Sequence, residues 1–209
     1  TQSLKNFSAL VKDTRVTSIE TRLMDDDAVG GMTLQARYAD LLVIGQFDPS
    51  CGVPGVMSDF PESVMMNCAR PVFIMPHTQK FSALPTKIAI AWDASLTATR
   101  AVVNALPVLK RCARADLVIF NPTVHPEAHG EEPGADMALY LSRHGIQVNV
   151  VCRDTHINEA EALLSYCDDE RIDLIVMGGY GHTRFREMML GGATREMLLS
   201  MTVPVLMSH

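Results

Sequence analysis

Residues 172–181 read IDLIVMGGYG, an apolar run that ends in glycines. Apart from Asp173, the first six residues have no polar side chain, which is typical of a parallel strand covered by helices on both faces. Outward from this run, apolar stretches alternate with segments of helical periodicity over residues 86–209. This alternation indicates parallel strands joined by right-handed crossovers, and therefore an α/β fold.

This second half of the chain, residues 86–209, contains five predicted strands and four predicted helices, enough for one doubly wound domain with strand order 3-2-1-4-5. The predicted strands are Lys87–Trp92, Asp116–Phe120, Gln147–Cys152, Ile172–Met177 and Val203–Met207. The predicted helices are Thr97–Leu109, Ala135–His144, Glu159–Cys167 and Thr194–Met201.

The first half of the chain, residues 1–78, repeats the end of the second half at a constant offset of 133 residues. Short strands can match by chance in two or three places, but more matches than that share this offset without a gap, so the pattern indicates duplication. The identical pairs are Asp40/Asp173, Leu41/Leu174, Val43/Val176, Gly45/Gly178, Pro71/Pro204 and Val72/Val205.

We therefore predict two tandem, mostly parallel five-stranded domains, residues 1–78 and 86–209, joined by a linker at residues 79–85. The first domain is expected to lack its initial strand–helix–strand part, since nothing in residues 1–39 matches it. The remaining elements predicted for residues 1–39 are a helix at Leu4–Lys12, a strand at Arg15–Leu23 and a helix at Asp25–Tyr38.

The composition excludes several classes of partner. The 209 residues carry a net charge of −6 and no block of Lys and Arg, which argues against nucleic acid or an anionic membrane surface. No apolar run approaches the roughly 18 residues of a membrane span. Five cysteines without a C-x-x-C pair are typical of reduced thiols, so we predict a cytoplasmic protein.

Two glycine-rich segments mark a candidate ligand site. Gly178 and Gly181 follow the predicted buried strand, and Gly191 and Gly192 open the helix that contains Thr194. Glycines let a ligand approach the backbone closely, and the N–H groups that begin a helix attract anions. The spacing predicts a nucleotide whose phosphates lie at the second segment, although turn geometry alone is the alternative reading.

Asp93 follows the first strand of the second half, where a carboxylate can accept a hydrogen bond from an adenine amino group. An N-cap for the helix that starts near Thr97 is an equally good reading of its position. The stretch Ala91-Trp92-Asp93-Ala94-Ser95, with the spacing Gly178-x2-Gly181-x9-Gly191, resembles the universal stress protein family in its tandem two-domain form.

The resemblance implies ATP or another adenine nucleotide as ligand, with or without Mg²⁺, and no metal site of the protein's own. It places Asp93 against adenine and the backbone of Phe120 or Asn121 beside the base. It implies that Met177 and Gly178 line the ribose, and that Gly181, Gly191, Gly192 and Thr194 surround the phosphates. Gly192 departs from the family pattern, which has Ser or Thr there, and Thr194 is a candidate replacement.

At the same offset, Gly181 corresponds to Asp48 and Gly192 to Asp59. Carboxylates at these positions repel phosphate, so we expect nucleotide in the second half only. The predicted function is a nucleotide-dependent stress-response protein with at most weak ATPase activity. The alternatives are a slow ATPase or nucleotidyl-transfer enzyme of a related fold, and a dimerisation module without ligand.

The last expectation concerns assembly. In a 3-2-1-4-5 sheet the matching final strands, Val72–Met75 and Val203–Met207, both lie at an edge, and open apolar edges tend to pair. We expect these two strands to pair with each other. The remaining flank of the first half would then be covered by a second chain, which predicts a homodimer.

Overall fold

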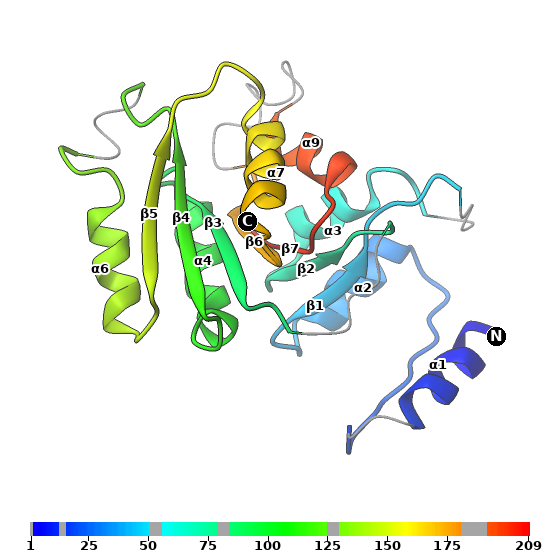
Figure 1. Cartoon of the computed structure of the whole chain (residues 1–209). Coiled ribbons are helices and arrows are strands. Elements are labelled where there is room, and N and C mark those ends of the chain that lie inside the picture. Colours follow the sequence, from blue (N-terminus) through cyan, green and yellow to red (C-terminus); the bar gives the residue numbers. More distant parts are fainter. Residues whose placement is uncertain (1, 13–15, 51–55, 79–83, 125–129, 181–191) are drawn as a thin grey trace.

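In the computed structural model, which describes residues 2–12, 16–50, 56–78, 84–124, 130–180 and 192–209, seven strands form one sheet with helices on both faces (Figure 1). The strands are β1 (Leu42–Gly45), β2 (Val72–Met75), β3 (Lys87–Ala91), β4 (Arg114–Phe120), β5 (Val148–Arg153), β6 (Leu174–Gly178) and β7 (Val205–Ser208). The helices are α1 (Gln2–Lys12), α2 (Ala28–Ala36), α3 (Phe60–Asn67), α4 (Leu96–Leu109), α6 (Ala135–Arg143), α7 (Glu159–Glu170) and α9 (Ala193–Ser200).

The second half has the predicted topology. Its strands lie in the order β5-β4-β3-β6-β7 and all pair in parallel, which is the expected 3-2-1-4-5 arrangement. The helices begin at polar caps, since Ser95 Oγ accepts the Ala98 N–H (3.1 Å) and Asn158 Oδ1 accepts the Ala160 N–H (2.8 Å). The α/β fold predicted from the sequence is therefore confirmed.

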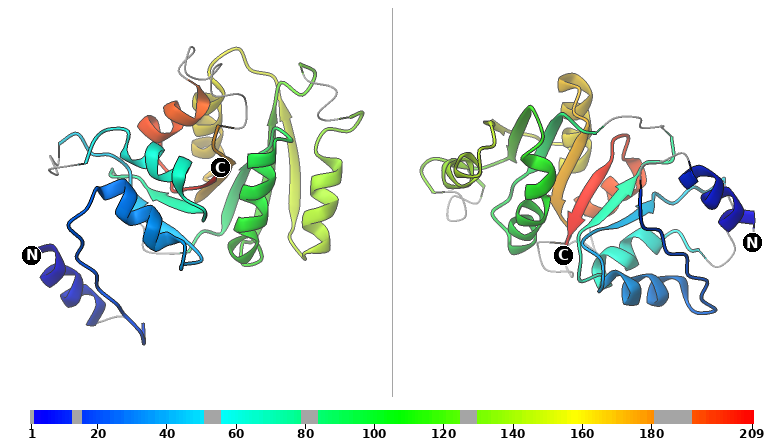
Figure 2. Two further views of the ribbon diagram at one scale, coloured as in Figure 1. Left: turned by 180° about the vertical axis from the view of Figure 1, so that it is seen from behind. Right: turned by 90° about the horizontal axis from the view of Figure 1, so that it is seen from below.

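The two halves are joined by the predicted pairing of their final strands. β2 and β7 pair antiparallel, with Val72 opposite Met207, Phe73 opposite Leu206 and Ile74 opposite Val205. Because Phe73 and Leu206 are themselves 133 residues apart, the register is symmetric about this pair. Figure 2 (right) shows β7, β2 and β1 side by side in the continued sheet.

Several elements of the two halves correspond at the offset of 133 residues. The bounds of α3 and α9 match residue for residue, as do those of β2 and β7. β1 corresponds to all but the first residue of β6, and α2 lies within the range that corresponds to α7. The local structure of residues 28–75 thus repeats that of the chain's C-terminal part.

The strand predicted for residues 15–23 is wrong, because residues 16–23 form no strand. At the offset this segment corresponds to β5, whose partner strand in the second half is β4. The described first half contains no counterpart of β4, so the segment has no strand to pair with. Val16 and Leu23 are accordingly exposed. The helix predicted for residues 25–38 is confirmed with narrower bounds, as α2.

Helices of both halves share one face of the sheet. A single core cluster contains Val64 and Met65 of α3 together with Tyr166 of α7 and Met197 of α9. The opposite face is covered by α4, whose Ala101 and Val102 pack in a second cluster with β3 and β6 (Figure 2, left). None of the helices described is long and apolar enough to cross a membrane.

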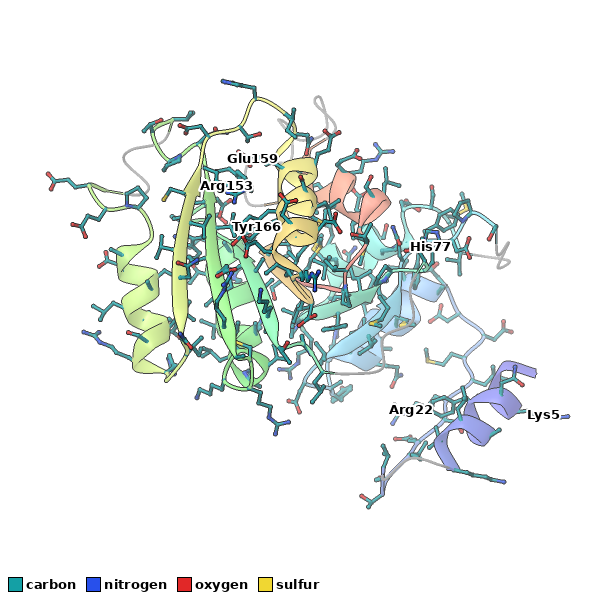
Figure 3. All side chains as sticks on the ribbon, viewed as in Figure 1. Lys5, Arg22, His77, Arg153, Glu159 and Tyr166 are labelled. Carbon is teal, nitrogen blue, oxygen red and sulfur yellow. The ribbon has the colours of Figure 1, made fainter. Side chains whose placement is uncertain are left out.

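A buried carboxylate links the sheet to α7. Asp116 of β4 is 1% exposed and accepts hydrogen bonds from Tyr166 Oη (2.9 Å), Asn149 Nδ2 (3.2 Å) and the Arg114 guanidinium. Burial alone would raise the pKa of this carboxyl, but the three donors outweigh burial and hold the pKa below its ordinary value. Figure 3 shows Tyr166 beside Arg153, whose guanidinium lies 4.7 Å from the ring centroid.

Tyr166→Phe should lower the free energy of unfolding by about 1–3 kcal/mol at pH 7, because a buried carboxylate loses one donor. A lowered pKa stabilises the fold above the ordinary Asp pKa and ceases to do so as the pH falls through the lowered value. The cost of the substitution should therefore shrink as the pH falls below about 4. Urea denaturation between pH 2 and 7 measures it, with Tyr140→Phe on α6 as the control. A cost that is independent of pH would contradict this account.

Candidate functional site

Three backbone corners with positive φ follow the carboxyl ends of three neighbouring strands. They are Ala94 after β3 (60°), Asn121 after β4 (50°) and Tyr180 after β6 (54°). A residue other than glycine seldom adopts positive φ, and such conformations cluster at functional sites. This edge of the sheet, which lies at the top of Figure 1, is also where an open α/β sheet binds its ligands.

Asp93 lies at the first of these corners. Its Oδ1 accepts the N–H of Ser95 (3.0 Å), and Ser95 in turn caps α4. The structure therefore assigns the N-cap to Ser95, not to Asp93. The Asp93 carboxylate is half-buried beside the first turn of α4 and offers acceptor oxygens at the end of β3.

Asn121 forms the second corner, and its groups are already engaged in the protein. Its N–H donates to the Arg153 carbonyl (2.9 Å), and its carbonyl accepts the Val124 N–H (3.0 Å). Its Oδ1 accepts the Thr155 N–H (2.8 Å). A ligand at this corner would find the second lone pair of the carbonyl rather than an unoccupied peptide group. Phe120, directly before it, packs against the core.

Gly178 and Gly179 let helices of both halves approach the end of β6. A Cβ on Gly178 would lie 2.5 Å from the Ala98 nitrogen of α4. A Cβ on Gly179 would lie 2.5 Å from Met65 Sδ of α3. Met177, by contrast, is 7% exposed and lies in the core, so its side chain is largely used in packing. The absent side chains therefore have a structural reason in addition to any role toward a ligand.

Thr194 links the two glycine segments. Its side chain is 2% exposed, and its Oγ1 accepts the N–H of Tyr180 (3.2 Å). Gly192 begins α9 without a side chain, and its carbonyl accepts the N–H groups of Arg195 (3.0 Å) and Glu196 (3.2 Å). Thr194 therefore fixes the corner after β6 against the start of α9. Gly181 and Gly191 of the predicted site lie outside the described residues.

The C-terminal end of α9 is held by the first half. Gln46 is 7% exposed, and its Nε2 donates to the carbonyls of Leu198 (3.0 Å) and Leu199 (2.9 Å). Its Oε1 faces the backbone N–H (3.2 Å) and Nδ1 (2.9 Å) of His77. At the offset, Gln46 corresponds to Gly179, so the two halves use this position differently.

These groups suit a ligand with an amino group and negative charge. Asp93 supplies a carboxylate acceptor, and the start of α9 supplies peptide N–H groups and the positive end of the helix dipole. Among the residues that the structure describes, no three His, Cys, Asp or Glu side chains gather in a way that could hold a metal ion.

A family model described as "Universal stress protein family" matches residues 85–209. The chain belongs to the universal stress protein family. The matched part contains β3 to β7 and every residue of the predicted site, so the resemblance read from the Asp93 stretch and the glycine spacing is confirmed at the level of the family.

Curated and solved relatives carry the same family name. The "Universal stress protein Slr1230" of Synechocystis sp. is 26% identical over 148 residues, 69% of this chain and 49% of the relative. This universal stress protein thus spans about half the length of that relative. A universal stress protein from Archaeoglobus fulgidus has a TM-score of 0.72 at 18% identity and covers 99% of this chain, with 76% of its own chain aligned.

Two further structures show likeness in fold. A putative universal stress protein from Pseudomonas aeruginosa has a TM-score of 0.64 at 10% identity, over 99% of this chain and 77% of its own. A universal stress protein solved in complex with cAMP has a TM-score of 0.45 at 16% identity, over 61% of this chain and 99% of its own.

Sequence reasoning missed the contributions of the first half to this edge of the sheet. Met65 and Gln46 are separated from the glycine segments by more than a hundred residues, and no motif connects them. The one available signal was the offset, which places Gln46 opposite a glycine. His209, whose Nδ1 lies 3.0 Å from the Gly179 carbonyl, was likewise not predicted.

Gly178→Ala and Gly45→Ala form a matched pair at corresponding positions. The first should lower the free energy of unfolding by about 1–3 kcal/mol, because its Cβ meets the backbone of α4. The second should change it by less than about 0.5 kcal/mol, since nothing lies within 4 Å of its Cβ. Urea denaturation of both variants measures the difference. Equal costs would show that α4 does not require a glycine here.

Proposed function

We propose that this protein is a stress-response regulator that binds ATP or another adenine nucleotide, with or without Mg²⁺, in its second half. The observation that carries the proposal is the convergence of Asp93, three corners of positive φ and the start of α9 at one edge of the sheet. Family membership supports the same reading, since the predicted site lies inside the matched residues.

In this proposal Asp93 accepts a hydrogen bond from the adenine amino group. The Ser95 N–H holds one carboxylate oxygen in place, so the acceptor is fixed in position before the ligand arrives. Fixed acceptors reduce the ordering cost of binding. Asn121 and Phe120 border the base from the next strand, and Gly178 allows close approach near the ribose.

The phosphates lie at the start of α9 in this proposal. Gly192 leaves the first N–H groups of the helix uncovered by a side chain, and these groups, with Gly181 and Gly191, would hold the phosphate oxygens. Thr194 acts indirectly, because its hydroxyl is buried and holds the Tyr180 N–H. It therefore positions the backbone after β6 rather than replacing the hydroxyl that the family pattern has at Gly192.

The corresponding edge of the first half is built differently. Asp59 begins α3 where Gly192 begins α9, so a carboxylate already stands at the positive end of that helix. Asp48, which corresponds to Gly181, accepts the N–H (2.8 Å) and Oγ–H (2.6 Å) of Ser50. Both carboxylates would repel phosphate. We therefore propose one nucleotide per chain.

Asp93→Ala should weaken ATP binding by roughly 1–3 kcal/mol, the cost of losing a hydrogen bond to a charged acceptor. Isothermal titration calorimetry measures the affinity and the stoichiometry together. Asp136→Ala, an exposed carboxylate in the first turn of α6, is the control and should bind like the wild type. Unchanged affinity in Asp93→Ala would remove the adenine role, and two nucleotides per chain would contradict the single site.

We also propose that residues 1–78 and 86–209 are copies of one unit joined by residues 79–85. The matching element bounds and the symmetric register of β2 with β7 support this division. A cytoplasmic location is proposed on the cysteine argument, and Cys68, Cys112, Cys152 and Cys167 of the described residues are free thiols.

The homodimer expected from the sequence is open to a direct test. Light scattering at micromolar concentration should give about twice the chain mass of 22.9 kDa if a second copy covers the flank of the first half. Val43→Lys on the exposed side of β1 should then return the mass to that of one chain. A monomer in the wild-type protein would contradict the homodimer.

A further inference from the structure

The first half leaves one sheet edge and one sheet face bare. β1 is the last strand of the described sheet on this side, and its outer edge has no partner strand there. On the face that α4 covers in the second half, Leu41 is 41% exposed and Val43 is 56% exposed. A Cβ on Gly45 would meet nothing within 4 Å. An open strand edge beside an apolar face invites another chain segment.

The second half shows what binds such a surface. Leu174 and Val176 correspond to Leu41 and Val43, yet both are 0% exposed, because α4 packs on them. Gly178, which corresponds to Gly45, lies against the first turn of α4. The outer edge of β6 is paired in parallel with β3. A strand followed by a helix therefore covers in the second half what is bare in the first.

Asp173 shows how the strand is anchored. Its Oδ2 accepts three hydrogen bonds from the start of β3, from Thr86 N (2.9 Å), Thr86 Oγ1 (2.8 Å) and Lys87 N (2.9 Å). The corresponding residue in the first half is Asp40, which is exposed. The bare flank therefore retains the carboxylate that fixes the register of an incoming strand.

The matches between β1 and β6 fall on this one surface. Asp173, Leu174, Val176 and Gly178 are the residues that contact β3 or α4, and their counterparts Asp40, Leu41, Val43 and Gly45 are identical. The intervening residues, which face the shared core, differ in the two strands: Leu42 and Ile44 correspond to Ile175 and Met177. The surface that would receive a strand and a helix is thus the one that is preserved.

We propose that the outer edge of β1 and the bare face of β1 and β2 bind a β-strand–helix segment of the chemistry of residues 86–111. The strand would lie parallel to β1 with its first N–H groups on Asp40. The helix would place small apolar side chains, like Ala101 and Val102 of α4, on Val43 and Gly45. A second copy paired edge to edge through β1 would satisfy the strand edge but would supply no helix for the apolar face.

The test uses the full chain and a fluorescently labelled synthetic peptide of residues 86–111. Fluorescence anisotropy should show saturable binding, and hydrogen exchange should slow at the β1 amides that point away from β2. Val43→Lys in the protein should weaken binding by about tenfold or more, because the helix would bury a charge. Asp40→Ala should also weaken it. Val103→Lys, an exposed position on α4 outside the flank, should leave binding unchanged.

Peptide variants give an independent control. Val102→Asp alters the buried face of the helix and should abolish binding, whereas Val103→Asp alters its exposed face and should not. Binding that is insensitive to Val43→Lys would mean that the peptide displaces β3 and α4 instead, and would overturn the proposal. A peptide that does not bind a monomeric chain would overturn it as well. A dimer that Val43→Lys dissociates and the peptide leaves intact would assign the flank to a second copy.

Discussion

The antiparallel pairing of β2 with β7 is the contact through which the halves become one structure. Both strands are apolar and would otherwise be sheet edges, so their pairing satisfies backbone groups and removes two open edges at once. The symmetric register about Phe73 and Leu206 places α3 beside α9 on the same face of the sheet. One core cluster therefore contains side chains of both halves, and the glycine-rich edge of the second half is packed against helix α3 of the first.

This packing gives α9 a partner at each end. At its start, Thr194 holds the backbone after β6 through the Tyr180 N–H, and at its end Gln46 donates to two carbonyls that a helix leaves unpaired. The proposed phosphate site is thus built on a helix whose far end is fixed by the other half. An electrostatic site benefits from such fixed geometry, because dipoles that are already oriented need no reorganisation when an anion binds.

Much of the fold could be predicted because its signals are local or periodic. The alternation of apolar runs gave the parallel sheet, and the constant offset led to the β2–β7 pairing. The segment at residues 16–23 failed because a strand exists only with a partner, and no local pattern reveals that the partner is absent. In the site, Asp93 and Thr194 were found by spacing, but the burial of Thr194 and the roles of Met65 and Gln46 depend on tertiary contacts between distant segments.

The two halves differ in a way that separates packing from binding. At positions that contact a strand or helix in the second half, the first half keeps the same residues, from Asp40 to Gly45. At positions proposed to meet phosphate it has Asp48 and Asp59, and at Gly179 it has Gln46, whose side chain reaches into α9. Loss of a ligand site removes the requirement for a bare backbone, whereas the sheet still requires its apolar face. The first half therefore retains the surface of a folding unit and uses its former ligand edge to hold the helix of its neighbour.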